Sequence, residues 1–188
     1  MRFRQLFAFL LFSLITVSTS TAQNDNTQVN NLAIGNKFID AFYSFNKDSL
    51  QTLVSSAQKS QSGILFYQKW AECANYKVID RTHYFAKNDS TIVFPVTVKD
   101  DLMTALAIDF NVTDTFHILL RNRKIVSVKT SSNDVTEYYK AKEWVNKNRP
   151  DLVVGCQLGV VGSKACECVL GMIKGFTEYT ENKKLTKH

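Results

Sequence analysis

The chain lacks the short motifs by which the common enzyme classes are recognised. It contains no glycine-rich phosphate loop, no Gly-x-Ser-x-Gly elbow, no His-Glu-x-x-His pair and no Cys₂His₂ spacing. It also lacks a stripe of arginine and lysine interleaved with aromatic residues, although its formal net charge is +6. From these absences we predict no metal centre, no cofactor and no nucleic-acid partner.

Long apolar runs are absent as well, except for one at the amino terminus. Residues 6–17 form this run after two arginines, and its length fits the core of a secretory signal but not a bilayer about 30 Å thick. Ser20 and Ala22 then supply the small residues of a cleavage site. We therefore predict a signal peptide over residues 1–22. The mature protein would start at Gln23, lie in the periplasm or be secreted, and have no membrane segment; an uncleaved anchor is the alternative.

Cysteine is scarce, and its four copies are unevenly placed. Cys156, Cys166 and Cys168 lie close to the carboxyl end, whereas Cys73 lies far from them. Export would place them where disulfides form, and a Cys-x-Cys pair without histidine at ligand spacing is weak evidence for zinc. We predict a disulfide between Cys156 and Cys168, with Cys166 as the alternative partner of Cys156, and a buried thiol at Cys73.

Apolar residues recur at steps of three and four in the first part of the mature chain. This spacing predicts a helix that starts at Val29, after a frayed polar stretch over residues 23–27. Asp48, with Gln51 three residues later, forms a capping box that predicts a short second helix. Residues 55–63 are then expected to form a polar connection to a third helix.

From Tyr76 onward the apolar period changes from 3.6 to 2, which indicates strands. Short turns join these strands, so the pattern predicts an antiparallel meander. A proline inside the second strand favours an edge position or a bulge. Asp134, three residues before Glu137, predicts the cap of a further helix that Pro150 ends. The predicted strands cover residues 76–86, 91–99, 104–120 and 125–131, and a last helix covers residues 164–181.

The longest predicted strand carries one residue that does not fit its neighbours. Asp114 shares the parity of an apolar row, so it would lie on the core face of the strand. A carboxylate in such a place is costly unless it is paired, hydrogen-bonded or protonated. Asp114 therefore has either a structural partner or a cavity to face. The apolar members of the row are Leu106, Ile108, Phe110, Val112, Phe116, Ile118 and Leu120.

Three short segments bear on the fold family. They are Asp114-Thr115-Phe116, residues 124–128 after a tight turn, and residues 38–50, where the first helix breaks and the second begins. With three helices preceding an antiparallel sheet, they resemble the nuclear transport factor 2-like superfamily, which includes SnoaL-like domains and ketosteroid isomerase. The resemblance implies an α+β fold in which the helices and a curved sheet enclose a cone-shaped cavity. The domain would cover residues 23–150, and residues 151–188 would add a cysteine-containing helical extension.

The same resemblance bears on chemistry. Asp114 matches the neutral, hydrogen-bond-donating aspartic acid in the oxyanion hole of ketosteroid isomerase. The other catalytic parts are missing, because Phe38 stands where the isomerase has a tyrosine and residues 55–63 hold no carboxylate to act as the base. We therefore assign no catalytic residue and keep Asp114 as the only candidate acid or base.

The sequence leaves three functions open. The first is a non-catalytic exported module that binds a small apolar ligand in its cavity. The second is an enzyme of the cyclase or isomerase type that uses Asp114. The third is an interaction protein that forms a homodimer through the outer face of its sheet. The residues that we expect to line the ligand cavity are Phe42, Tyr67, Trp70, Phe110, Asp114 and Phe116.

The predicted cleavage is tested on protein recovered from its own cells. We expect a chain of 166 residues, which is 188 less the 22 of the signal, with Gln23 at its amino terminus. Intact-mass spectrometry and amino-terminal sequencing measure this directly. A chain that still begins at Met1 would contradict the prediction.

Overall fold

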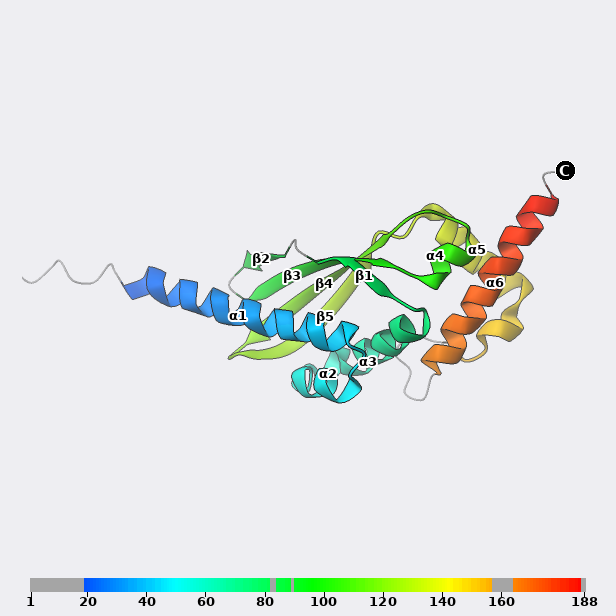
Figure 1. The fold of residues 1–188 in the computed structure, drawn as a ribbon. Coiled ribbons are helices and arrows are strands. Elements are labelled where there is room, and N and C mark those ends of the chain that lie inside the picture. Colours follow the sequence, from blue (N-terminus) through cyan, green and yellow to red (C-terminus); the bar gives the residue numbers. More distant parts are fainter. Residues whose placement is uncertain (1–18, 82–83, 89, 157–163, 187–188) are drawn as a thin grey trace, which may run out of the picture.

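The computed structural model describes residues 19–81, 84–88, 90–156 and 164–186, with side chains from residue 29 onward. This part of the chain forms an antiparallel sheet with helices at its face and at one end, which confirms the predicted α+β class (Figure 1). The helices are α1 (Thr19–Tyr43), α2 (Lys47–Leu53), α3 (Gln58–Cys73), α4 (Asp101–Ala105), α5 (Thr136–Asn148), the 3₁₀ helix η1 (Pro150–Val153) and α6 (Ala165–Leu185). The strands are β1 (Lys77–Asp80), β2 (Phe85–Asn88), β3 (Thr91–Lys99), β4 (Val112–Arg121) and β5 (Lys124–Ser132).

The sheet has the order β1-β3-β4-β5, and β2 pairs with β3 beside β1. The predicted first strand is thus two short strands, while the bounds predicted for the second strand agree with β3. Pro95 lies within β3, although β3 is flanked on both sides. On one side β3 pairs with β2 through residues 91–93 and with β1 through residues 97–99, so Pro95 lies between the two pairings. Its missing N–H therefore interrupts no described pairing on that side.

The third predicted strand is wrong over residues 104–111. The carboxylate of Asp100 accepts a hydrogen bond from the backbone N–H of Met103 at 2.8 Å, which caps the short helix α4 in this region. Ala107 follows with a φ of 55°, and β4 begins only at Val112. The cap therefore favours a helix where the alternating apolar pattern predicted a strand. It satisfies the backbone N–H of Met103 locally, whereas in a strand this donor would need a partner on a neighbouring strand.

The predicted alternation holds within β4 itself. Its buried residues are Val112, Asp114, Phe116, Ile118 and Leu120, all on one face. A two-residue turn joins β4 to β5, and both its residues, Asn122 and Arg123, have positive φ values of 49° and 60°. This turn geometry matches the twist of a hairpin and sets the register of β5.

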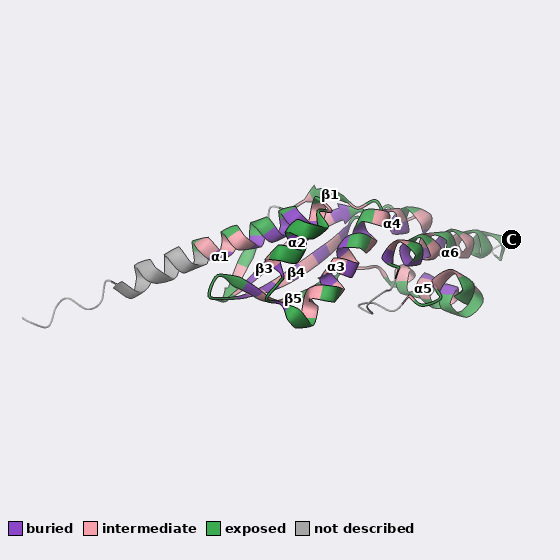
Figure 2. Ribbon diagram, turned by 90° about the horizontal axis from the view of Figure 1, so that it is seen from below, coloured by how far each residue is buried: buried purple, intermediate pink, exposed green. Residues whose placement is uncertain are grey.

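Helices α1, α2 and α3 lie across one face of the sheet, and the core fills the space between them (Figure 2). Its centre is aromatic: Phe116 of β4 contacts Phe38 and Phe42 of α1, with ring centroids 5.6 Å and 4.9 Å apart. All three side chains have no measurable exposure. Edge-to-face packing of this kind adds about 0.5–1.5 kcal/mol per pair to the effect of burial.

Several helix boundaries differ from the prediction. Helix α1 already includes residues 23–27, since no proline or glycine interrupts residues 19–34. Helix α2 is capped by Asn46, whose side-chain oxygen accepts from the N–H of Ser49 at 3.0 Å, and not by Asp48. Helix α3 begins at Gln58, so most of the predicted connection is helical.

The carboxyl-terminal extension packs against the same core. Val169, Met172 and Phe176 of α6 are buried together with residues of the sheet, and α6 contacts α3, α4 and α5. Its helix agrees closely with the predicted one. Thr180 also donates a hydrogen bond to the carbonyl of Ala105 at 3.0 Å, which joins α6 to the end of α4.

Two disulfide-bonded pairs hold the extension in place. Cys156 and Cys168 form one, as predicted, with Cα atoms 5.4 Å apart. Cys73 forms the other with Cys166, with Cα atoms 5.2 Å apart, so the prediction of a buried thiol at Cys73 is wrong. The end of α3 brings Cys73 against the start of α6, and this proximity is created only by the packing of two helices distant in the sequence.

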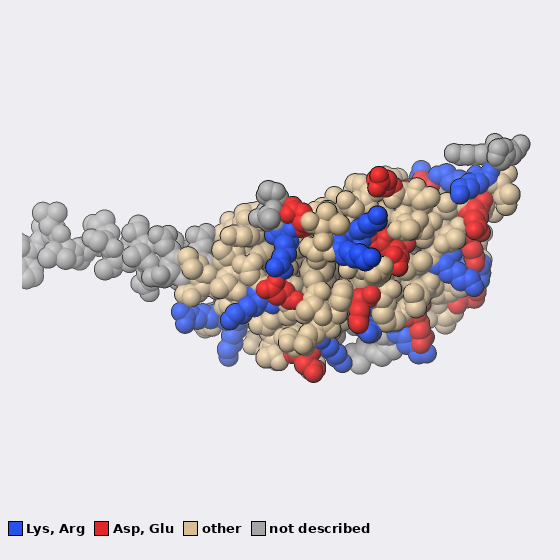
Figure 3. Space-filling view, viewed as in Figure 1, with Lys and Arg blue, Asp and Glu red and all other residues tan. Residues whose placement is uncertain are grey.

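The described surface carries both signs of charge. On the face seen in Figure 3, lysine and arginine side chains lie among aspartate and glutamate side chains. None of the helices in the described ranges combines the length and the apolar character that a membrane span needs.

The packing of α6 gives a direct test of the fold. A Cβ atom added at Gly171 would collide with the backbone carbonyl of Leu152 in η1, whereas one added at Gly63 of α3 meets nothing within 4 Å. We expect Gly171→Ala to lower the free energy of unfolding by about 1–3 kcal/mol, as overpacking does. The control Gly63→Ala should raise it by about 0.5–1 kcal/mol through helix propensity. Urea denaturation of both variants measures these changes. A Gly171→Ala variant whose free energy of unfolding equals that of the unaltered protein would contradict the described contact between α6 and η1.

Candidate functional site

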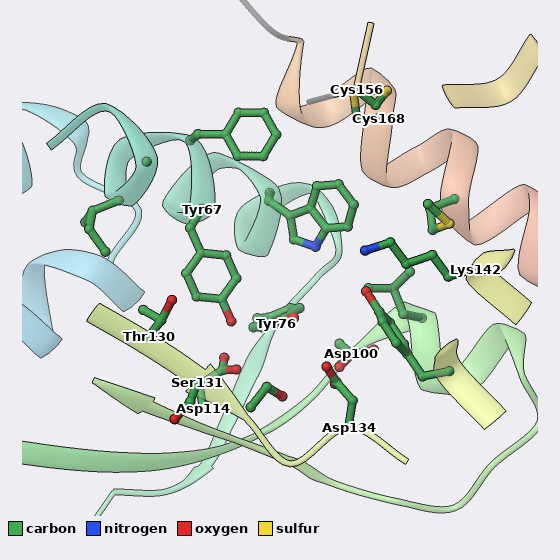
Figure 4. Close-up of a pocket in the computed structure, with 18 of the residues that line it drawn as sticks. Tyr67, Tyr76, Asp100, Asp114, Thr130, Ser131, Asp134, Lys142, Cys156 and Cys168 are labelled. Atoms are coloured by element: carbon green, nitrogen blue, oxygen red, sulfur yellow. A yellow bond between two sulfur atoms is a disulfide. The ribbon is translucent and has the colours of Figure 1, made fainter. Parts of the chain in front are cut away.

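A pocket of about 880 Å³ opens between α3, the strands β4 and β5, and the carboxyl-terminal helices (Figure 4). Its volume falls in the range of sites for small organic molecules, which is about 300–1,000 Å³. Every helix after α2 contributes to it, and so do both strands of the last hairpin. The lining residues are Ser60, Gly63, Ile64, Phe66, Tyr67, Trp70, Tyr76, Asp100, Leu102, Met103, Asp114, residues 128–132, Asp134, Tyr138, Tyr139, Lys142, Asn146, Val153, Cys156, Cys168 and Met172.

The six residues expected to line a cavity divide into two groups. Tyr67, Trp70 and Asp114 line the pocket. The other three belong to the packing behind it: Phe42 and Phe116 are fully buried in the aromatic core, and Phe110 is half-buried before β4 begins. Phe116 and Asp114 share a face of β4, but helix α1 covers Phe116. The sequence therefore identified the strand that contributes to the pocket. It did not identify which residues of the apolar row belong to the filled core.

Asp114 lies at the boundary between the filled core and the pocket. Its exposed fraction is 1 %, and its oxygen Oδ2 has no hydrogen-bond partner in the described part of the chain. The hydroxyl of Tyr43 is likewise buried without a partner there. Two such groups are unusual in a folded interior, because an unsatisfied buried polar atom costs about 1–3 kcal/mol. Of the two residues, Asp114 lines the pocket, so its oxygen Oδ2 is an acceptor without a described partner at the wall of the cavity.

Burial also controls the protonation of Asp114. Removal from water raises the pKa of this carboxyl group to about 7, and the negative charges of Asp134 and Asp100 act in the same direction. The hydroxyls of Tyr67 and Tyr43 lie beside the carboxylate and favour its ionised form, which limits the rise.

Two further carboxylates face the pocket from other elements. Asp100 comes from the start of α4, where its carboxylate accepts a hydrogen bond from the backbone N–H of Met103, and Asp134 comes from the segment before α5 and points toward the cavity in Figure 4. Burial raises the pKa of each, and the negative charge of Asp134 adds to the effect on Asp100. The predicted role of Asp134 as a helix cap is wrong, because Val135 precedes α5 and makes no side-chain cap.

One cation reaches the cavity from the opposite side. Lys142 of α5 extends its amine into the pocket (Figure 4), and its charge lowers the pKa of Asp134. Asp134 also accepts a hydrogen bond from the hydroxyl of Tyr139 at 3.5 Å, which is long. Within the described residues Lys142 takes part in none of the ion pairs at 4.0 Å or less.

The walls between these charges are aromatic. Phe66 and Trp70 of α3 have ring centroids 6.2 Å apart, and Tyr67 meets Tyr76 edge-on at 6.5 Å. In Figure 4 the ring of Tyr67 projects from α3 toward the strand that carries Thr130. Burial raises the pKa of the Tyr67 and Tyr76 hydroxyls well above the ordinary value, so both remain neutral donors at physiological pH.

The carboxyl-terminal extension closes one end of the pocket. The disulfide between Cys156 and Cys168 forms part of the lining, together with Met172 of α6 and Val153 of η1. The extension is thus part of the site and not only a stabilising addition. The sequence left this role of the extension open as an alternative to stabilisation. It did not identify five other lining residues: Tyr76 was placed in a strand, Asp100 in a connection, Asp134 at a helix cap and Tyr138 on a helix face, and Lys142 had no assigned role.

This arrangement combines neutral hydroxyl donors, carboxylates and aromatic faces around one cavity. Among the described residues no three histidine, cysteine, aspartate or glutamate side chains are placed to hold a metal ion. Comparison with known proteins finds no match. No family model, no curated protein and no solved structure matches this chain. The function is therefore inferred from the residues of the pocket.

The unusual state of Asp114 gives a test of the site. The unfolded chain releases this proton near pH 3.8 and the folded protein near pH 7, so ionisation of Asp114 destabilises the fold progressively as the pH rises between these values. We expect Asp114→Asn to remove that cost. At about 1.4 kcal/mol per pKa unit, the variant should gain about 2–4 kcal/mol over the unaltered protein at pH 7.5 and little at pH 4.

Urea denaturation at the two pH values measures the difference. The exposed Asp109, which lies outside the pocket, supplies the control Asp109→Asn, whose stability should follow that of the unaltered protein at both pH values. An Asp114→Asn variant that is less stable than the unaltered protein at pH 7.5 would show that the carboxylate is ionised and stabilising.

Proposed function

We propose that this protein is an exported, non-catalytic binding domain that takes up a small and largely apolar ligand in its pocket. The observation that supports this most directly is a cavity of about 880 Å³ with aromatic walls and a few polar groups directed into it. The proposal extends to the fold family: three helices followed by an antiparallel sheet are consistent with a nuclear transport factor 2-like cone. The disulfide-bonded cysteines fit a periplasmic or secreted location.

The polar groups of the pocket suit binding better than catalysis. The hydroxyls of Tyr67, Tyr76 and Tyr138 line the pocket, and burial raises their pKa values, so they donate hydrogen bonds and do not serve as bases. A donor set of this kind orients a ligand without attacking it. The buried oxygen of Asp114 offers the matching acceptor.

A second candidate function rests on one observation. Asp114 has a pKa of about 7, which lies in the range where a carboxyl group both gives and accepts protons. An enzyme of the cyclase or isomerase type would use it as its acid or base. In that case the Asp114→Asn variant would accumulate an unconverted compound whose mass or retention time differs from that of the ligand carried by the unaltered protein.

Native mass spectrometry of protein purified gently from its own cell envelope tests the proposal. We expect the unaltered protein to retain a small molecule, and Thr130→Trp to retain less of it, because an indole at this lining position would occupy part of the space that the ligand needs. The matched control Thr177→Trp places the same side chain on the exposed side of α6, outside the pocket, and should retain the ligand.

Two results would contradict the proposal. One is a protein that retains nothing and also fails to take up a neutral apolar dye such as Nile red. The other is a ligand-free dimer whose stability is unaffected by Thr130→Trp, which would favour the interaction function instead.

A further inference from the structure

We infer that the ligand of this pocket is a small organic cation, an alkylated ammonium group attached to an apolar body. This inference rests on the proposed function, since it names the chemical class of the molecule that the same pocket would hold. It is carried by the placement of carboxylates and aromatic faces around one cavity.

Three carboxylates converge on the pocket from three separate elements. Asp100 stands before α4, Asp114 lies in β4 and Asp134 precedes α5. Within the described residues none of the three makes an ion pair at 4.0 Å or less, and Asp114 Oδ2 is an unpartnered acceptor in a side chain that is 1 % exposed. A donor or a positive charge is the missing partner of such a group.

The other charges around the pocket do not cancel the carboxylates. Lys142 is the cation that extends inward, and Lys129 stands exposed on the edge strand β5. Three aspartates against two lysines give the lining one formal negative charge, which is present once the pH exceeds the pKa of Asp114 at about 7. The remaining titratable side chains of the lining are Tyr67, Tyr76, Tyr138 and Tyr139, and η1 and α6 contribute no ionisable side chain to it.

A bare metal ion does not fit this site. The described carboxylates are not grouped closely enough for three of them to bind one ion. The volume of about 880 Å³ is also far larger than a metal ion requires. An organic cation matches both features, because its charge is spread over alkyl groups that can contact several carboxylates at a distance.

Aromatic faces favour the same class of ligand. Phe66, Trp70, Tyr67 and Tyr76 surround the cavity between the carboxylates. The face of an aromatic ring attracts a cation by about 0.5–2 kcal/mol, and alkylated ammonium groups use this attraction most because water holds them weakly. Carboxylates and rings together therefore favour a cation over a neutral or anionic molecule of the same shape.

Binding of such a cation would be linked to protons. The carboxyl groups of Asp100, Asp114 and Asp134 all have raised pKa values, so part of this set is protonated in the empty pocket below neutral pH. A bound cation favours their ionised forms and releases protons. The affinity for a cation should therefore rise with pH, whereas that for a neutral molecule of the same shape should not.

The experiment compares choline with 3,3-dimethylbutan-1-ol, which has the same shape but carries carbon in place of the charged nitrogen. Ligand-observed NMR on the mature protein detects weak binding of both at pH 5.5 and pH 8. We expect choline to bind about tenfold more tightly than the alcohol at pH 8, which corresponds to about 1.4 kcal/mol. This preference should shrink at pH 5.5.

Variants assign the effect to the pocket. Asp134→Asn removes a charge from a residue that caps no helix, and Asp100→Asn keeps a good capping side chain at the start of α4 while removing its charge. Each should reduce the preference for choline about twofold to fivefold, in the range of a weakened ion contact. The exposed control Asp109→Asn should leave the preference unchanged.

The outcomes separate this inference from the proposed function. Equal or tighter binding of the alcohol, or no binding of either probe while Nile red is still taken up, would overturn the inferred cation and leave the binding function standing. Failure of choline, the alcohol and Nile red together would overturn both.

Discussion

The burial of one face of β4 is the constraint on which the rest of the structure depends. Its alternate residues enter the interior, and Phe116 is fixed there by the rings of Phe38 and Phe42. A shift of one residue in the register would turn this whole row to the outer face. Because Asp114 belongs to the same row, the packing that buries Phe116 also forces a carboxylate to the edge of the core. The pocket begins where the helices stop covering that row.

The burial of Asp114 has an energetic cost that its neighbours in the fold do not offset. The described residues around Asp114 supply neutral hydroxyls and no positive charge at ion-pair distance, so the carboxyl group keeps a raised pKa and one oxygen keeps no partner. A chain selected for stability alone would place an apolar residue there, since replacement of buried polar groups by apolar ones is often neutral or favourable. The retained carboxylate therefore argues for a role in binding, and Asp100 and Asp134 in the same cavity strengthen that argument.

The carboxyl-terminal extension forms one wall of the pocket. Helix α6 shares the core through Val169 and Phe176, and two disulfides fix it to the end of α3 and to the segment after η1. The bond between Cys156 and Cys168 itself faces the cavity. Stability and site geometry are thus coupled, because any movement of α6 would change the volume available to a ligand.

The sequence by itself determined the parts that depend on local periodicity. It predicted the α+β class, the bounds of β3, the alternation in β4, the last helix and the pairing of Cys156 with Cys168. The tertiary structure alone decided which side chains meet. Asp100 and Asp134 resemble ordinary turn and cap residues in the sequence, and Phe42 and Phe116 resemble cavity residues as much as core residues. The physical reason is that periodicity specifies which face of an element is buried, whereas the boundary between a filled core and an open pocket depends on where distant helices end. The same reason explains why Cys73 found its partner 93 residues away.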